Sequence, residues 1–141
     1  MTVQKPGRSL TKLVQFIVSP NTEAPLVRCE AWVTQIERVT EPFAALVEDP
    51  LRCPWNQRSG EERLRVTIAA GLTQRANLFS VSEEEGLVPI LEPPNITLAS
   101  EITTSGQYRV SVLVTADGAR AATASFIFEC QHFRNVWLAR G

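Results

Sequence analysis

Apolar and polar residues alternate with a period of two over residues 107–131, which is the spacing of a half-buried β-strand. The apolar series comprises Tyr108, Val110, Val112 and Val114, then Ala122, Ala124, Phe126, Phe128 and Cys130. Between the two series lies Asp117–Gly118, a pair that tolerates the positive φ angles of a hairpin turn. The pattern predicts a β-hairpin over residues 107–131.

The same alternation predicts a long strand over residues 26–38. Its core-facing series is Val27, Cys29, Ala31 and Val33, which puts Trp32 on the opposite face. Leu64, Val66 and Ile68 predict a further amphipathic strand that ends at Gly71. Weaker strand candidates, rich in Val, Ile, Leu, Phe and Thr, lie at residues 11–18, 42–48, 76–82, 86–91 and 96–101.

Turn-forming residues recur about every ten residues, at Ser19–Asn21, Asp49–Pro50, Ser59–Gly60, Glu92–Asn95 and Ser105–Gly106. Short strands at this spacing favour an antiparallel sandwich or barrel, because parallel strands need intervening helices. Residues 35–47 and 82–86 are expected to form short helical turns at most. The prediction is an all-β chain without an internal repeat.

The order of these features resembles an immunoglobulin-like β-sandwich domain family of bacterial proteins without an assigned function. The resemblance rests on the segments Val27–Val33, Asp49–Trp55, Val66–Gly71, Arg75–Val81 and, above all, Ser105–Val114 followed by Ala116–Ala119. It implies one antiparallel sandwich of about seven to nine strands with Greek-key connections. The expected organisation is a lead at residues 1–8, the sandwich at 9–131 and an aromatic tail at 132–141.

Length and charge narrow the function classes. A chain of 141 residues suffices for one domain, and its formal net charge of −1 lacks the broad basic field of nucleic-acid-binding proteins. Arg63, Arg65 and Arg109 would form a local patch for an anionic partner only if their strands were adjacent. No apolar run approaches the roughly 20 residues needed to span a bilayer, so we expect no membrane insertion.

Three cysteines, Cys29, Cys53 and Cys130, favour buried thiols in a reducing compartment, and hence a cytoplasmic protein. The alternative is a disulfide from Cys29 to Cys130, with Cys53 left free. The sequence does not distinguish these, because it does not give the distance between the two Cα atoms.

The sequence contains few residues that could act in catalysis or bind a metal ion. His132 is the single histidine, no nucleophile elbow or phosphate-binding loop occurs, and Cys53, Cys130 and His132 would be the available metal ligands. Because Cys130 belongs to the core-facing series, a structural thiol is the better interpretation. We therefore expect no catalytic, cofactor-binding or metal-binding residues, and an enzyme that uses Cys53 or His132 is the least favoured hypothesis.

The C-terminal tail combines the residue types that anchor protein interfaces: Phe133, Arg134, Val136, Trp137 and Leu138. The alternative is that the tail folds back and caps the sandwich. The leading hypothesis is a non-enzymatic module that binds another protein or a second copy of itself through this tail, its loops or an edge strand.

A small-ligand or carbohydrate-binding module is the main alternative. It is motivated by Trp32, which is predicted to face away from Cys29, and by Trp55 in a turn-rich segment. Aromatic faces of this kind stack on sugar rings and other planar ligands.

Overall fold

The computed structural model describes residues 1–4, 13–82, 86–94, 98, 102, 106–130 and 136–140. Within them the chain is all-β and its strands pair antiparallel. The strands are β1 (Thr2–Gln4), β2 (Leu13–Ser19), β3 (Leu26–Arg38), β4 (Ala44–Ala45), β5 (Leu51–Cys53), β6 (Val66–Ile68), β7 (Gln74–Ser82), β8 (Gly86–Pro89), β9 (Gly106–Asp117), β10 (Ala122–Cys130) and β11 (Val136–Arg140). A short 3-10 helix, η1 (Gly60–Arg63), precedes β6.

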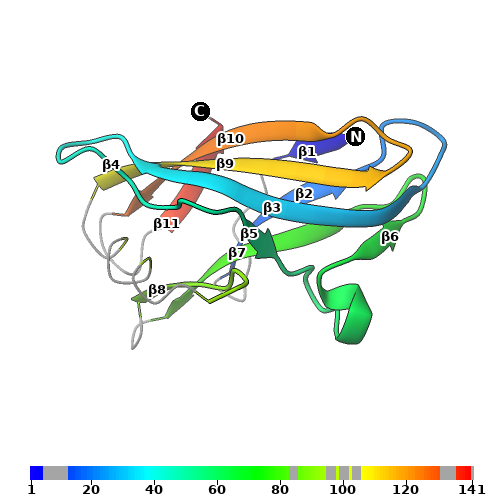
Figure 1. Cartoon of the computed structure of the whole chain (residues 1–141), viewed down its shortest axis with the longest axis horizontal. Helices are drawn as coiled ribbons and strands as arrows, with labels where there is room; N and C mark the ends of the chain where they lie inside the picture. Colours follow the sequence, from blue (N-terminus) through cyan, green and yellow to red (C-terminus); the bar gives the residue numbers. More distant parts are fainter. Residues whose placement is uncertain are drawn as a thin grey trace.

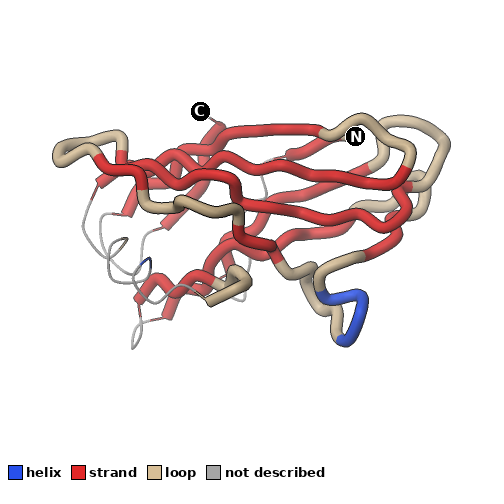
Figure 2. The backbone as a smooth tube through the Cα atoms, viewed as in Figure 1, coloured by secondary structure: helices blue, strands red, loops and turns tan. Residues whose placement is uncertain are grey.

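The strands form two sheets, as Figures 1 and 2 show. The four-stranded sheet has the order β1-β2-β7-β8. The seven-stranded sheet has the order β11-β10-β9-β3-β4, with β5 and β6 also paired to β3. The arrangement is consistent with a β-sandwich.

Aromatic side chains from both sheets meet in the core. Phe16 of β2 stacks on Phe126 of β10 with ring centroids 6.1 Å apart, and Phe79 of β7 lies 5.1 Å from Phe128 of β10. Tyr108 of β9 stacks on Phe128 at 5.0 Å. All five side chains are buried, and the Phe16–Phe126 and Phe79–Phe128 contacts hold one sheet against the other.

The predicted hairpin is confirmed as β9 and β10, and its expected core-facing residues from Tyr108 to Val114 are buried. The long strand at residues 26–38 is also confirmed as β3. Trp32 lies on the face opposite Cys29 and is half-buried, as its position in the alternation predicts.

Val27 was expected to face the core beside Cys29, and that prediction is wrong. Its side chain is 39% exposed, while Leu26 and Cys29 are both buried. Arg28 has a φ of 50°, and the ladders to β9 and β6 both change register beside it. The extra residue of this β-bulge reverses the alternation, so Leu26 replaces Val27 on the inner face.

The segment after β5 crosses from one sheet to the other. Arg52 exchanges backbone hydrogen bonds with Glu92, of 2.7 and 2.9 Å. Farther along, the Asn77 N–H donates to the Pro54 carbonyl and the Asn56 N–H to the Arg75 carbonyl, each at 2.8 Å. Backbone hydrogen bonds therefore close this side of the molecule.

Several elements differ from expectation. The sequence did not predict β1, β5 or β11, and residues 60–63 form a 3-10 helix just before a predicted strand. No helical turn forms over residues 35–47, which contain the end of β3 and all of β4. The strand expected at 96–101 lies outside the described residues except for Leu98. Within the described chain, no helix is long and apolar enough to cross a membrane.

A matched pair of phenylalanine truncations tests the core. Phe16→Ala removes a fully buried ring and should lower the free energy of unfolding by about 3–5 kcal/mol in urea titrations. Phe43→Ala removes a ring that is 70% exposed, and should change it by only about 0.5 kcal/mol. Equal losses from the two variants would contradict this packing.

Candidate interaction surface

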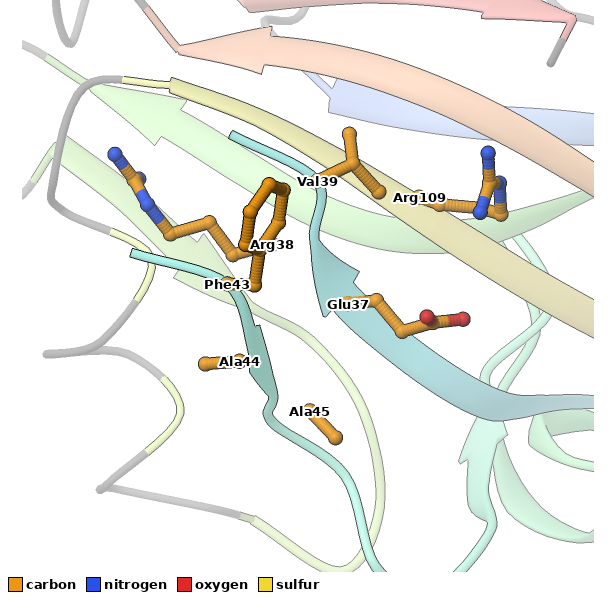
Figure 3. Close-up of a pocket in the computed structure, with 7 residues that line it drawn as sticks. All are labelled: Glu37, Arg38, Val39, Phe43, Ala44, Ala45 and Arg109. Atoms are coloured by element: carbon orange, nitrogen blue, oxygen red, sulfur yellow. The ribbon is translucent and has the colours of Figure 1, made fainter. Parts of the chain in front are cut away.

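A hollow of about 490 Å³ lies at one end of the seven-stranded sheet, where β3, β4 and β9 meet (Figure 3). It is lined by Glu37, Arg38, Val39, Phe43, Ala44, Ala45 and Arg109. Glu37 pairs with Arg109 in the ladder between β3 and β9, and with Ala45 in the ladder between β3 and β4. Sheet pairing therefore brings together residues that are far apart in the sequence.

Phe43 is the most exposed large apolar side chain of this surface. It is 70% exposed and directly precedes β4, whose two alanines are also exposed. Figure 3 shows its ring standing beside the end of β3. Leu46 and Val47 then turn inward, and Val47 is buried. The inward pair anchors the segment, so the exposure of Phe43 is built into the fold.

Two hydrogen bonds hold the Arg38 side chain in place where it lines the hollow. Its Nη1 donates a 2.9 Å hydrogen bond to the Tyr108 hydroxyl, and its guanidinium lies 5.4 Å from the centre of that ring. Its Nη2 donates to the Glu41 carbonyl at 3.2 Å. Because Tyr108 is buried and stacked on Phe128, Arg38 connects the surface to the core.

Gly106 makes room for this arrangement at the start of β9. Its φ is 154°, and a Cβ there would lie 2.5 Å from Arg38 Nη1 and 2.6 Å from Thr40 Oγ1. The neighbouring backbone is tied down, since the Val39 N–H donates to the Gln107 carbonyl at 2.9 Å. Only glycine fits both the backbone conformation and the space.

A second polar cluster surrounds Trp32 on the outer face of β3. Glu30 forms ion pairs with Arg52 at 3.1 Å and with Arg65 at 2.6 Å. The Arg52 guanidinium also lies 5.0 Å from the centre of the Trp32 ring. The arginines are thus neutralised, and one guanidinium covers the aromatic ring.

The patch of Arg63, Arg65 and Arg109 does not form. β6 and β9 lie on opposite sides of β3, so Arg65 and Arg109 are separated by that strand. Arg63 belongs to η1 and pairs with Glu92. The alternation had indicated two strands but not their neighbours in the sheet.

Trp55 is a core residue. It is 1% exposed, and its Nε1–H donates a 3.2 Å hydrogen bond to the Cys29 carbonyl. The indole therefore satisfies a backbone group where β3 bulges, and it is not accessible to a ligand. The suggestion that Trp55 contributes to a ligand-binding face is wrong.

Cys29 and Cys53 are buried free thiols. Burial raises the pKa of the Cys29 thiol from its ordinary 9.0 to about 12, and the Glu30 carboxylate adds to the shift. Burial also raises the pKa of the Cys53 thiol above its ordinary range. Neither thiol is a thiolate at neutral pH, so neither is an activated nucleophile.

The alternative disulfide between Cys29 and Cys130 is excluded by the strand register. Cys130 lies opposite Gly106, whereas Glu30, next to Cys29, lies opposite Thr115 at the other end of β9. Extended backbone between those points spans about 30 Å. A disulfide requires Cα atoms about 4.4–6.8 Å apart.

The C-terminal residues are described in part. Val136–Arg140 forms β11, with Val136 opposite Cys130 and Leu138 opposite Phe128. Phe133, Arg134 and His132 lie outside the described residues. The sequence placed this tail beyond the last strand, and the structure pairs its final part with β10.

No metal-binding group is found within the described residues, since none of them form a cluster of three or more His, Cys, Asp or Glu. His132 and the side chain of Cys130 fall outside that description. The predicted absence of a metal site therefore stays a prediction.

No family model, curated protein or solved structure matches this chain. The resemblance to bacterial immunoglobulin-like domains thus stays a prediction. Functional inference rests on the surface itself.

Gly106→Ala should destabilise the protein more than Gly71→Ala. Both glycines have a φ in the range that disfavours other residues, but a Cβ at Gly71 meets open space. We expect a loss of about 1 kcal/mol for Gly71→Ala and about 2–4 kcal/mol for Gly106→Ala in urea unfolding. Equal losses would mean that Arg38 moves aside at no cost.

The two buried thiols predict a loss of stability at high pH. Their pKa values are higher in the folded protein than in the unfolded chain, so the stabilisation is complete below about pH 9 and falls as the pH rises towards the folded values. Each thiol should contribute a slope of about 1.4 kcal/mol per pH unit in that window. Urea unfolding from pH 8 to 11 should show a flatter decline in a Cys29→Ala, Cys53→Ala double variant, because the other ionisable groups are common to both proteins.

Proposed function

We propose that this protein is a non-enzymatic interaction module that binds another protein through the hollow around Phe43. The observation that carries the proposal is the 70% exposure of this ring in a hollow that Arg38 and Arg109 also line. Aromatic and arginine side chains are the commonest anchors of protein interfaces. A partner that covered the ring would remove this apolar surface from water.

The other exposed large apolar residues among the described side chains support the choice of Phe43. Val27 and Leu72 are exposed by 39% and 60%, but both are aliphatic and neither lines the hollow. Around Phe43, the exposed ring, two small alanines and charged side chains of both signs lie together. A ring flanked by polar groups is the usual composition of an interface centre and its rim.

The tail residues Phe133, Arg134, Val136, Trp137 and Leu138 remain a second proposed contact. The pairing of β11 with β10 favours the alternative in which the tail folds back onto the sheet. The experiment below includes the tail for this reason.

Carbohydrate binding and cysteine chemistry have less support. Trp55 is buried, and the Trp32 ring is covered by Arg52 at 5.0 Å. The Cys53 thiol is fully buried and protonated at neutral pH. These observations favour binding by the surface over either chemistry.

We infer further that the fold belongs to the immunoglobulin-like Greek-key class. The neighbour order β10-β9-β3-β4 in one sheet and β1-β2-β7 in the other supports this, because it parallels the G-F-C-C′ and A-B-E orders of such domains. Free buried thiols support a cytoplasmic location.

Affinity purification from the source cells tests the proposed function. A bound protein should be lost from Phe43→Ala and retained by Leu72→Ala, which removes an exposed apolar side chain elsewhere. Phe133→Ala tests the tail in the same experiment. Loss only with Phe133→Ala would assign binding to the tail, and retention by every variant would overturn the role of Phe43.

A further inference from the structure

One edge of β4 has no pairing partner among the residues that the structure describes. β4 is the last strand in the order of the seven-stranded sheet. The Leu46 N–H donates to the Ile36 carbonyl at 2.8 Å, and Ala44 pairs with Arg38 in the same register. Since backbone groups alternate in direction along an antiparallel strand, those of Phe43 and Ala45 point away from β3. Among the described residues, β4 pairs only with β3, and no backbone hydrogen bond of a turn or loop reaches Phe43 or Ala45.

The side chains of this edge do not protect it. Phe43, Ala44 and Ala45 are all exposed and carry no charge. Natural edge strands are commonly protected by lysines, by prolines within the strand or by an element that covers them. The short length of β4 is its main protection, so a strand added here would also need contacts from side chains that flank the pairing.

The charged residues that flank the strip in the sequence are all acidic. Glu41 precedes the exposed strip, and Glu48 and Asp49 follow it. All three are exposed, and none forms an ion pair with another described residue. No lysine or arginine occurs between Val39 and Leu51. The strip therefore has an uncharged centre with acidic residues on both sides of it in the sequence, and Arg38, which donates to the Glu41 carbonyl, lies beside one of them.

This distribution disfavours a second copy of the chain. A two-fold antiparallel pairing with Ala45 opposite Ala45 of the other copy, so that their outward-pointing backbone groups face each other, would set Glu41 against Asp49 of that copy, twice in each dimer. Like charges directly opposite each other destabilise a strand pair. A strand with basic ends would meet opposite charge at the same positions.

We infer that the open edge of β4 binds an extended peptide segment with an apolar or small centre and lysine or arginine at both ends. The segment adds as a further strand, its backbone hydrogen-bonds to Phe43 and Ala45, and its basic ends face Glu41, Glu48 and Asp49. This inference rests on the proposed function and names the chemistry of its partner. Phe43 would cover the central side chains of the bound segment.

The test uses a labelled synthetic peptide, Lys-Lys-Thr-Val-Thr-Val-Thr-Lys-Lys, and a counterpart with glutamate in place of every lysine. Fluorescence anisotropy with the full chain should show binding of the basic peptide about tenfold tighter than of the acidic one. Binding should weaken as salt rises from about 0.05 to 0.5 M, because exposed ion pairs are screened.

Two variants, each with a matched control, distinguish the contribution of the acidic residues from that of backbone pairing along the edge. A Glu41→Lys, Glu48→Lys double variant should reverse the preference between the peptides, while Glu61→Lys, on the exposed η1 helix, should leave it unchanged. Ala45→Pro removes an N–H that points to the open edge and takes no part in pairing with β3, so it should abolish binding while the thermal unfolding temperature stays close to that of the parent. Ala45→Ser keeps the N–H and should bind normally.

Each outcome decides between the proposals. Equal or absent binding of the two peptides overturns this inference, as does wild-type affinity of Ala45→Pro. A self-associated protein that Ala45→Pro converts to a monomer would assign the edge to a second copy instead. If Phe43→Ala still loses a captured protein in any of these cases, the proposed function stands while the basic-strand partner falls.

Discussion

The pairing of β3 is the constraint on which the rest of the structure depends. One edge of this strand binds β9 along most of its length, and the other binds β6, β5 and β4 in succession. To pair with three short strands in turn, β3 must bend, and the bulges at Arg28 and beyond Val33 let it do so. These bulges decide which side chains enter the core and which remain outside.

The long alternating segments could be predicted from sequence, because a half-buried strand repeats the same choice at every second residue. The bounds of β3 and the existence of the β9–β10 hairpin are confirmed for this reason. β5 has three residues, too few for a repeat, and it exists because β3 and Glu92 supply hydrogen-bonding partners on its two sides. The bulge at Arg28 also lacked a signal, because its positive φ is imposed on a residue that gives no local sign of it.

The candidate site was only partly visible in the sequence. Residues 42–48 were predicted as a strand, but no pattern indicated that Phe43 would be exposed, because its exposure depends on where β4 stops pairing with β3. The acidic flanks could have been read directly, since residues 40–50 contain three acidic and no basic residues. Without the register of β4 against β3, however, these acidic residues could not be distinguished from the charged residues of an ordinary solvent-exposed loop.

The two parts of this sheet edge, beside β5 and beside β4, differ in their backbone hydrogen bonds. Beside β5, backbone bonds to Glu92 and from Asn77 close the edge and join the sheets. Beside β4, no described segment closes the edge. The Arg38 side chain next to it is nevertheless held in place, by its hydrogen bond to Tyr108 and by the space that the missing Cβ of Gly106 leaves. A partner that binds a preformed edge loses less conformational entropy, so this ordered base is compatible with the proposed binding of an extended segment.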